Sequence, residues 1–368
     1  MIVDSHLHIF PFLDGPCGYA SRAEHLQRLQ YYMVGHGQPV RRVADDAFVP
    51  GGSLQLFEPT ALGPEGLTDV DFRVTRNGRF EWTQDGEDRY IHFMPPSLAS
   101  NEATPEAILA QMAYVGVDVG VLQNAHLYGR LNDEFADAVR RYPDKLVGLA
   151  EVDEPRAHTD EEIQSLRRAV RDQGLKGLYY ANRGFLWDHF EHGFDDAMFD
   201  EFWGTVAKLG IVVFWEIFGV PEHTPRTFLD EIDRLLRWQA RFPMIPSVLT
   251  HGLSPDAILN PPPPIERLFR DERITIEILY PIGWGRNHDY PYVELRPVIR
   301  ALYRQVGRER LCWGSDLPNV ERNCTYRQSL DYLRRCADFI PPSDLDLILG
   351  DNLTRLFGLR ASVERQGL

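Results

Sequence analysis

The feature that most constrains the fold is an alternation of short apolar segments with longer amphipathic ones, running from about residue 104 to the end of the chain. Short buried strands that alternate with helices form a parallel sheet covered by those helices. With one further apolar segment at the start of the chain, eight strands are predicted. Eight such units over roughly 250–300 residues fit an α/β fold of the (β/α)8 TIM-barrel type. The predicted strands lie within residues 1–10, 119–123, 146–152, 175–180, 211–217, 247–251, 274–279 and 311–314.

The segments between these strands have the lengths and boundary signals of helices. Thr104 is a suitable N-cap for the first helix, and Thr224 followed by Pro225 suits the start of the fifth. A doubly wound open sheet is the alternative architecture, but the chain has no glycine-rich phosphate-binding loop that would support it. The predicted helices lie at residues 104–114, 132–142, 160–173, 197–209, 225–242, 265–270, 293–306, 325–337 and 343–357.

Residues 11–100 interrupt this pattern directly after the first strand. The stretch is rich in glycine and proline, and it is too long for a plain connection between two elements. Within it, residues 72–94 alternate apolar and polar side chains around Asn77-Gly78 and Asp85-Gly86, the pairs typical of tight hairpins. We therefore expect a single barrel domain over residues 1–368, with an inserted cap at 11–100 that contains a small antiparallel meander.

Composition and charge exclude several classes of protein. The net charge of −15 does not favour binding to nucleic acid or to anionic membranes. No apolar run is long enough for a membrane span, and the start of the chain does not resemble a signal peptide. The four cysteines lack metal-binding or redox spacing and are expected to be free thiols of a reducing compartment. We expect a cytoplasmic protein.

The first strand contains a pair of histidines, His6 and His8, separated by one residue. Because alternate side chains of a strand share a face, both rings and the Asp4 carboxylate are predicted to lie on one side. Two imidazoles on one face of a rigid strand can bind one transition-metal ion. The alternative is that one histidine is packed in the core and the other is exposed.

Polar residues recur at the predicted carboxyl ends of the other strands, which converge at one mouth of a barrel. Burying an unpaired carboxylate costs several kcal/mol, roughly, and a shared cation removes that cost. The alternative for each residue alone is an ion pair on the rim. The strand-end residues are His6, His8, Gln123, Asn124, His126, Glu151, Asp153, Tyr179, Tyr180, Asn182, Arg183, Glu216, His251, Glu277, Tyr280 and Asp316.

Several motifs at these positions resemble those of the amidohydrolase superfamily, and in particular its amidohydrolase-related (amidohydrolase 2) branch. That branch contains aminocarboxymuconate-semialdehyde and resorcylate-type decarboxylases and 2-pyrone dicarboxylate lactonases. The resemblance covers residues 1–10 and about 104–360 and leaves the insertion unexplained. The similar stretches are Asp-Ser-His-Leu-His at 4–8, Val-Leu-Gln-Asn-Ala-His at 121–126 with Asn132, Lys-Leu-Val-Gly at 145–148, Thr-His-Gly at 250–252, Trp-Gly-Ser-Asp-Leu-Pro at 313–318 and the closing residues 348–359.

The resemblance implies that His6, His8 and Asp316 bind one divalent metal ion and that His251 transfers protons beside it. The family usually supplies a further histidine from the fifth strand, where this chain has Glu216. Glu216 is therefore the predicted fourth ligand, since a carboxylate oxygen can also bind zinc or manganese. Zinc is the expected metal, with manganese or iron as alternatives. Lys176 lies near the start of its strand and is not expected to bridge two metals.

The function expected from this resemblance is a metal-dependent hydrolase that attacks a small organic acid, lactone or amide with metal-activated water, with His251 and Asp316 as catalytic groups. One alternative is non-oxidative decarboxylation of an aromatic or muconate-type acid. Another is a barrel that has lost catalysis and only binds a ligand. The partner is expected to be a small anionic molecule, and the resemblance also makes a homodimer possible. The candidate substrate-binding residues are Arg183, Tyr180, Asn124, Arg89 and Trp284, with Arg286 as a further arginine.

Overall fold

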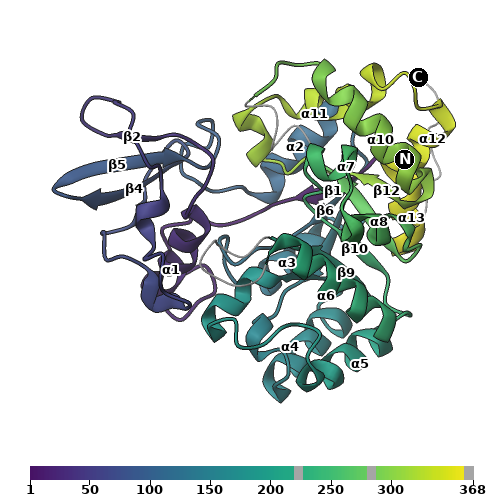
Figure 1. The fold of residues 1–368 in the computed structure, drawn as a ribbon, viewed down its shortest axis with the longest axis horizontal. Helices are drawn as coiled ribbons and strands as arrows, with labels where there is room; N and C mark the ends of the chain where they lie inside the picture. Colours follow the sequence, from purple (N-terminus) through teal and green to yellow (C-terminus); the bar gives the residue numbers. More distant parts are fainter. Residues whose placement is uncertain (219–226, 280–286, 360–368) are drawn as a thin grey trace.

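The computed structural model describes residues 1–218, 227–279 and 287–359, and its centre is an eight-stranded parallel sheet rolled into a barrel (Figure 1). The strands are adjacent in the order in which they occur in the chain, as in a (β/α)8 barrel, and the predicted fold is confirmed. The strands are β1 (Val3–Leu7), β6 (Val119–Leu122), β7 (Leu146–Ala150), β8 (Gly177–Ala181), β9 (Val212–Glu216), β10 (Ser247–Leu249), β11 (Ile274–Ile278) and β12 (Leu311–Trp313).

The barrel closes where the end of β1 meets the chain that follows β12. The backbone N–H of His8 donates to the carbonyl of Leu317, and the N–H of Asp316 donates to the carbonyl of His6, both at 2.9 Å. Because the two segments are hydrogen-bonded to each other, the side chains of His6, His8 and Asp316 start from neighbouring backbone positions.

Helices surround the barrel and bury their apolar faces against it (Figure 1). In α6, for example, Ile232, Leu235 and Trp238 are buried at helical spacing. None of the described helices is long and apolar enough to cross a membrane. The helices after the insertion are α2 (Pro105–Val115), α3 (Asn132–Arg141), α4 (Asp160–Arg171), α5 (Asp200–Leu209), α6 (Phe228–Arg241), α7 (Pro255–Leu259), α8 (Pro263–Arg270), α10 (Arg296–Val306), α11 (Tyr326–Cys336), α12 (Pro342–Asp346) and α13 (Asn352–Phe357).

Helix boundaries differ from the prediction at several places: the helices expected from residues 197 and 293 each begin as a short 3-10 turn, and α7 was not predicted. The helix expected to begin at Pro225 is described from Phe228, after a capping box formed by Thr227 and Asp230, while Thr224 and Pro225 lie outside the described residues. The helix expected at 343–357 is divided by a π-helical turn at Leu347–Asp351. Short 3-10 helices also occur: η1 (Leu54–Leu56), η2 (Pro64–Gly66), η3 (Glu154–Arg156), η4 (Asn182–Asp188), η5 (Ala197–Phe199), η6 (Val293–Leu295), η7 (Arg308–Arg310) and η8 (Asn319–Arg322).

Residues 11–100 contain a separate antiparallel sheet, which lies to one side of the barrel in Figure 1. Its strand order is β2-β5-β4-β3, from β2 (Val40–Arg42), β3 (Arg73–Val74), β4 (Arg79–Gln84) and β5 (Glu87–His92). The stretch also forms α1 (Arg22–Met33), which was not predicted. The ring of His25 in α1 contacts the carbonyl oxygens of Gly15 and Leu127, each at 2.9 Å, and so joins this helix to the loop after β6.

Candidate active site

Three side chains from the two ends of the chain meet at the mouth of the barrel. The Nε2 atoms of His6 and His8 lie 3.1 Å apart. Oδ1 of Asp316 lies 2.8 Å from Nε2 of His8 and 3.8 Å from Nε2 of His6. All three residues are buried, and among the described residues they form one of two groups close enough to share a metal ion. The other group, Asp188, Glu191 and His192, is partly exposed and lies outside the cavity described below.

The surroundings of the two rings fix which nitrogen faces the cluster. Nδ1 of His8 lies 2.8 Å from the backbone carbonyl of Gln123, which can only accept a hydrogen bond. Nδ1 of His6 lies 2.9 Å from the carboxylate of Glu277. Burial raises the pKa of Glu277, but the charge of His6 and hydrogen bonds from His6 and Ser5 outweigh it and lower this pKa to about 2. Each Nδ1 therefore carries a proton directed away from the cluster, so Nε2 is the nitrogen of each ring that faces the cluster and can bind a cation.

Two converging lone pairs and a carboxylate oxygen need a positive charge between them. The pKa of His6 reflects this need: burial lowers it, but Glu277 and Asp316 outweigh burial and raise it to about 9. Two imidazole nitrogens and one carboxylate oxygen, with room for a further ligand on the cavity side, are a donor set that suits a catalytic divalent ion. The residues present thus fit the metal that the sequence predicted.

Asp4 does not join this cluster, contrary to the expectation from simple alternation along the strand. Its carboxylate accepts hydrogen bonds from the hydroxyls of Ser315 and Tyr326, at 2.6 and 2.8 Å. The pairing of β1 with β6 shifts in register between Asp4 and Leu7, so the regular two-residue repeat is lost there. Burial is the main reason why the pKa of Asp4 is raised to about 6. We assign to Asp4 a structural role in the closure of the barrel.

His251 lies directly above the cluster. Its ring makes an edge contact with His6, with centroids 4.9 Å apart, and 29% of its side chain is exposed. Removal from bulk water and the nearby His6 lower the pKa of His251 to about 3, so the ring is neutral near pH 7. Both His251 and Asp316 have a φ of +62°, a left-handed conformation that is uncommon outside glycine.

A cavity of about 350 Å³ opens above these residues. His8, His251 and Asp316 line its floor, and residues of the insertion line its outer part. A larger hollow of about 780 Å³ lies on the outside of the barrel near α4, but it contains none of the cluster residues. The 350 Å³ cavity is therefore the candidate active site. Its remaining lining residues are Tyr32, Val34, Gly35, His36, Gly37, Gln38, Phe93, Ala125, Leu127, Tyr128, Tyr179, Arg183, Glu216, Phe218, Asn319 and Arg322.

Glu216 lines this cavity but is not part of the group of three close ligand atoms. Its carboxylate accepts a hydrogen bond from Tyr32 at 3.3 Å, and its Oε1 lies 3.9 Å from Nδ1 of His251. Burial raises the pKa of Glu216, and the charge of Arg183 opposes that rise. The hydrogen bond from Tyr32 and the neighbouring side chains of His251 and Arg183 thus hold the carboxylate of Glu216, the expected fourth ligand, at this position.

Arg183 is the predicted substrate-binding residue that the structure brings into the cavity. Its guanidinium carbon lies 4.1 Å from the ring centre of Phe218 and 5.1 Å from that of Tyr32. Its Nε atom is buried and has no hydrogen-bond partner among the described residues. A guanidinium that is held between aromatic rings and has an unbonded Nε is well placed to bind an anionic group.

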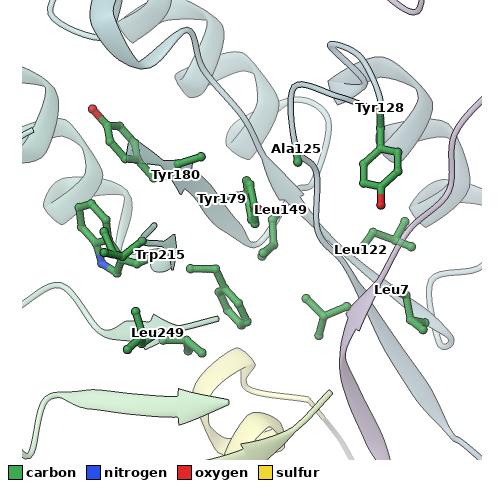
Figure 2. Packing of buried hydrophobic residues seen from close by; sticks show 14 of the residues in the cluster. Leu7, Leu122, Ala125, Tyr128, Leu149, Tyr179, Tyr180, Trp215 and Leu249 are labelled. Atoms are coloured by element: carbon green, nitrogen blue, oxygen red, sulfur yellow. The ribbon is translucent and has the colours of Figure 1, made fainter. Parts of the chain in front are cut away.

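The other candidate substrate-binding residues that the structure describes do not line this cavity. Tyr180 points away from the barrel interior into an aromatic cluster (Figure 2). Asn124 is buried and donates to the carbonyl of Gly129 at 3.2 Å, which holds the loop after β6. Arg89 bonds to Gln84 and Asp85 at the β4–β5 hairpin and to Gln55 of η1. Trp284 and Arg286 lie outside the described residues, and Lys176 is exposed before β8.

Other residues of the site had no predicted role. Tyr32 comes from α1. This helix was detectable in principle from its N-cap, because the side chain of Ser21 accepts a hydrogen bond from the N–H of Glu24. Tyr128 lies against the ring of His8, with centroids 4.5 Å apart, and its hydroxyl accepts from Asn319 at 2.6 Å. Glu277 was noted only as a strand-end carboxylate, since its contact with His6 depends on how β11 is placed relative to β1.

A parallel barrel with polar side chains gathered at the carboxyl ends of its strands is the architecture of many enzymes. The family model described as amidohydrolase matches residues 3–359, and the chain belongs to this family. A search of curated proteins finds no significant match.

Several solved structures share the fold at low sequence identity. A probable 2-pyrone-4,6-dicarboxylic acid hydrolase from Acinetobacter baumannii is 21% identical, with a TM-score of 0.55 over 70% of this chain and 90% of that one. The 5-carboxyvanillate decarboxylase from Sphingomonas paucimobilis is 18% identical, with a TM-score of 0.51 over 68% and 82%. A dihydroxybenzoic acid decarboxylase from Polaromonas sp. JS666, with bound manganese and the inhibitor 2-nitroresorcinol, is 18% identical, with a TM-score of 0.52 over 70% and 86%.

Proposed function

We propose that this chain is a metal-dependent hydrolase acting on a small organic acid, lactone or amide. The observation that carries the proposal is the convergence of two imidazole lone pairs and a carboxylate, with Nε2 of His8 only 2.8 Å from Oδ1 of Asp316, at the floor of a cavity that also contains Arg183. Amidohydrolase family membership supports an enzyme of this kind.

His6, His8 and Asp316 would hold one divalent ion. Zinc suits two imidazoles and a carboxylate, and manganese or iron are the alternatives. Manganese is supported by the ion bound in the similar decarboxylase from Polaromonas. When bound, such an ion polarises a substrate oxygen and makes a water molecule more acidic. Glu216 is left out of this ligand set, because its carboxylate faces His251 and Arg183.

The chain's own groups then have distinct tasks. Arg183 binds the anionic group of the substrate and orients it over the floor of the cavity. His251 is neutral, and because its Nδ1 is buried beside Glu216, its Nε2 is the nitrogen that exchanges a proton with the substrate or with water. Aromatic rings of Tyr32, Tyr128 and Phe218 limit access of bulk water to this space.

A decarboxylase is the second candidate. It is supported by the two similar decarboxylases, which share the fold with the similar hydrolase. In that case the same arginine would bind a ring substituent, and a proton taken from water or from the substrate would pass through His251 to the carbon atom that loses carbon dioxide. The two reactions differ in their products rather than in the residues they require.

Product analysis distinguishes them. Enzyme purified without chelators is incubated with a panel of lactones, amides and carboxyl-labelled aromatic acids, and proton release and labelled carbon dioxide are followed together. We expect a ring-opened acid with proton release from a lactone, or a cleaved acid together with an amine from an amide, and no labelled gas. The variant His251→Asn, which keeps the metal ligands, should lose this turnover. Labelled carbon dioxide would overturn the hydrolase proposal in favour of the decarboxylase.

A further inference from the structure

Glu277, at the seventh strand of the barrel, is a fully buried carboxylate with an unusual number of hydrogen-bond donors around it. Its Oε1 accepts from Oγ of Ser5 at 2.5 Å and from Nε2 of Gln123 at 3.3 Å. Its Oε2 lies 2.9 Å from Nδ1 of His6 and accepts from Oγ1 of Thr250 at 2.7 Å. One carboxylate thus links the first, second, sixth and seventh strands at the level of the candidate metal site.

Oε2 also accepts a hydrogen bond from the backbone N–H of His251, at 3.0 Å. This bond is made at the residue whose φ is +62°, so the carboxylate stabilises a turn that the backbone would otherwise adopt at a cost. Glu277 therefore contacts both the ring of a proposed metal ligand and the turn that aims the proposed proton-transfer residue.

The absence of a side chain at Gly314 leaves the space that this carboxylate occupies. Gly314 follows β12, and a Cβ atom added there would lie 2.7 Å from Oε1 of Glu277, 2.7 Å from Oγ of Ser5 and 2.8 Å from Cβ of His6. Any larger residue at 314 would displace the carboxylate or the ring that it holds. The glycine in the motif around Asp316 thus has a packing reason that involves Glu277.

We propose that Glu277 is the positioning residue of this site, which fixes the ring of His6 with Nε2 toward the metal and holds the turn that aims His251 into the cavity. The inference rests on the proposed metal site. A carboxylate on the outer nitrogen of a ligating histidine orients the ring and increases its basicity, and removing such a partner lowers metal affinity by about 10–100-fold.

The test compares Glu277→Gln with Glu151→Gln. Both carboxylates are buried, that of Glu277 in the seventh barrel strand and that of Glu151 directly after the third, but the carboxylate of Glu151 contacts neither His6 nor His251. Dissociation constants for zinc and manganese are measured by competition with a chelator, and unfolding of the metal-free proteins is measured in parallel. Thr250→Val is a milder variant, because it removes one hydrogen bond to Oε2 with little change in volume.

We expect Glu277→Gln to weaken metal binding by about 10–100-fold, Thr250→Val to weaken it by a smaller factor, and Glu151→Gln to leave it unchanged. At saturating metal, kcat of Glu277→Gln should remain at least tenfold low, since the turn at His251 is no longer held. Unchanged affinity in both Glu277→Gln and Thr250→Val would overturn the inference, even if their stability fell. A wild-type protein that binds no metal would instead overturn the proposed function itself, and the inference with it.

Discussion

Tyr179 and Tyr180 are consecutive residues of β8, and their side chains lie on opposite sides of the barrel wall (Figure 2). Tyr179 lines the cavity at the barrel mouth. Tyr180 packs outward, with its ring centre 5.0 Å from that of Trp203 and 5.3 Å from that of Trp215. The alternation of side chains along a strand is the cause, and it decides which tyrosine can meet a substrate.

Tyr180→Phe should leave kcat/KM within about twofold of the wild type. The hydroxyl of Tyr180 is buried and has no hydrogen-bond partner among the described residues, so its loss should leave stability equal or raise it by about 1 kcal/mol. Tyr179→Phe should change KM or kcat severalfold, because its hydroxyl lies close to Glu216. Steady-state kinetics and thermal unfolding of the two variants check this, and a kinetic effect confined to Tyr180→Phe would contradict it.

Arg183→Met should raise KM for an anionic substrate while leaving kcat largely unchanged. A hydrogen bond to a charged group contributes about 1.5–3 kcal/mol, which corresponds to roughly a 10–150-fold rise in KM. The control is Arg168→Met, which removes an exposed arginine from α4 on the outside of the barrel. Equal KM values for Arg183→Met and the wild type would remove Arg183 from the binding site.

Glu151 should make stability depend on pH. Burial raises its pKa from 4.5 to about 8, against the charges of His126 and Arg130 and with support from Glu154 and Glu162. Between these values the folded chain holds a proton that the unfolded chain has released, so the free energy of unfolding falls as pH rises, by at most about 1.4 kcal/mol per pH unit.

Glu151→Gln should remove this pH dependence. Denaturant unfolding of both proteins at pH 5, 6.5 and 8 checks the expectation, and the stability of the variant relative to the wild type should increase at each step. A difference that stays constant across the three pH values would show that Glu151 does not titrate in this range.

The barrel was predictable because its strands are short, apolar and separated by helices with clear caps. Where the chain departs from regular periodicity, the prediction failed for local reasons. The register shift after Asp4 turns that side chain toward Ser315 and Tyr326. The helix at 22–33 was overlooked because the glycines and prolines around it dominate the pattern.

The site was predictable only in part, because strand-end position identifies a side chain without giving its direction. His6, His8, His251 and Asp316 are brought together as expected. Glu216 also reaches the mouth, but Tyr32 from a distant segment binds its carboxylate. Contacts of this kind depend on the closed barrel and on the placement of the insertion, which no local pattern encodes.

The central claim is that His6, His8 and Asp316 bind one metal ion without Glu216. Metal analysis of protein purified without chelators tests it most directly, with His8→Ala and Glu216→Ala analysed beside the wild type. We expect about one divalent ion per chain in the wild type and in Glu216→Ala, and almost none in His8→Ala, because the imidazole supplies a ligand and the glutamate does not. Wild-type protein that contains no metal and still turns over substrate, or Glu216→Ala that loses its metal as His8→Ala does, would contradict the account.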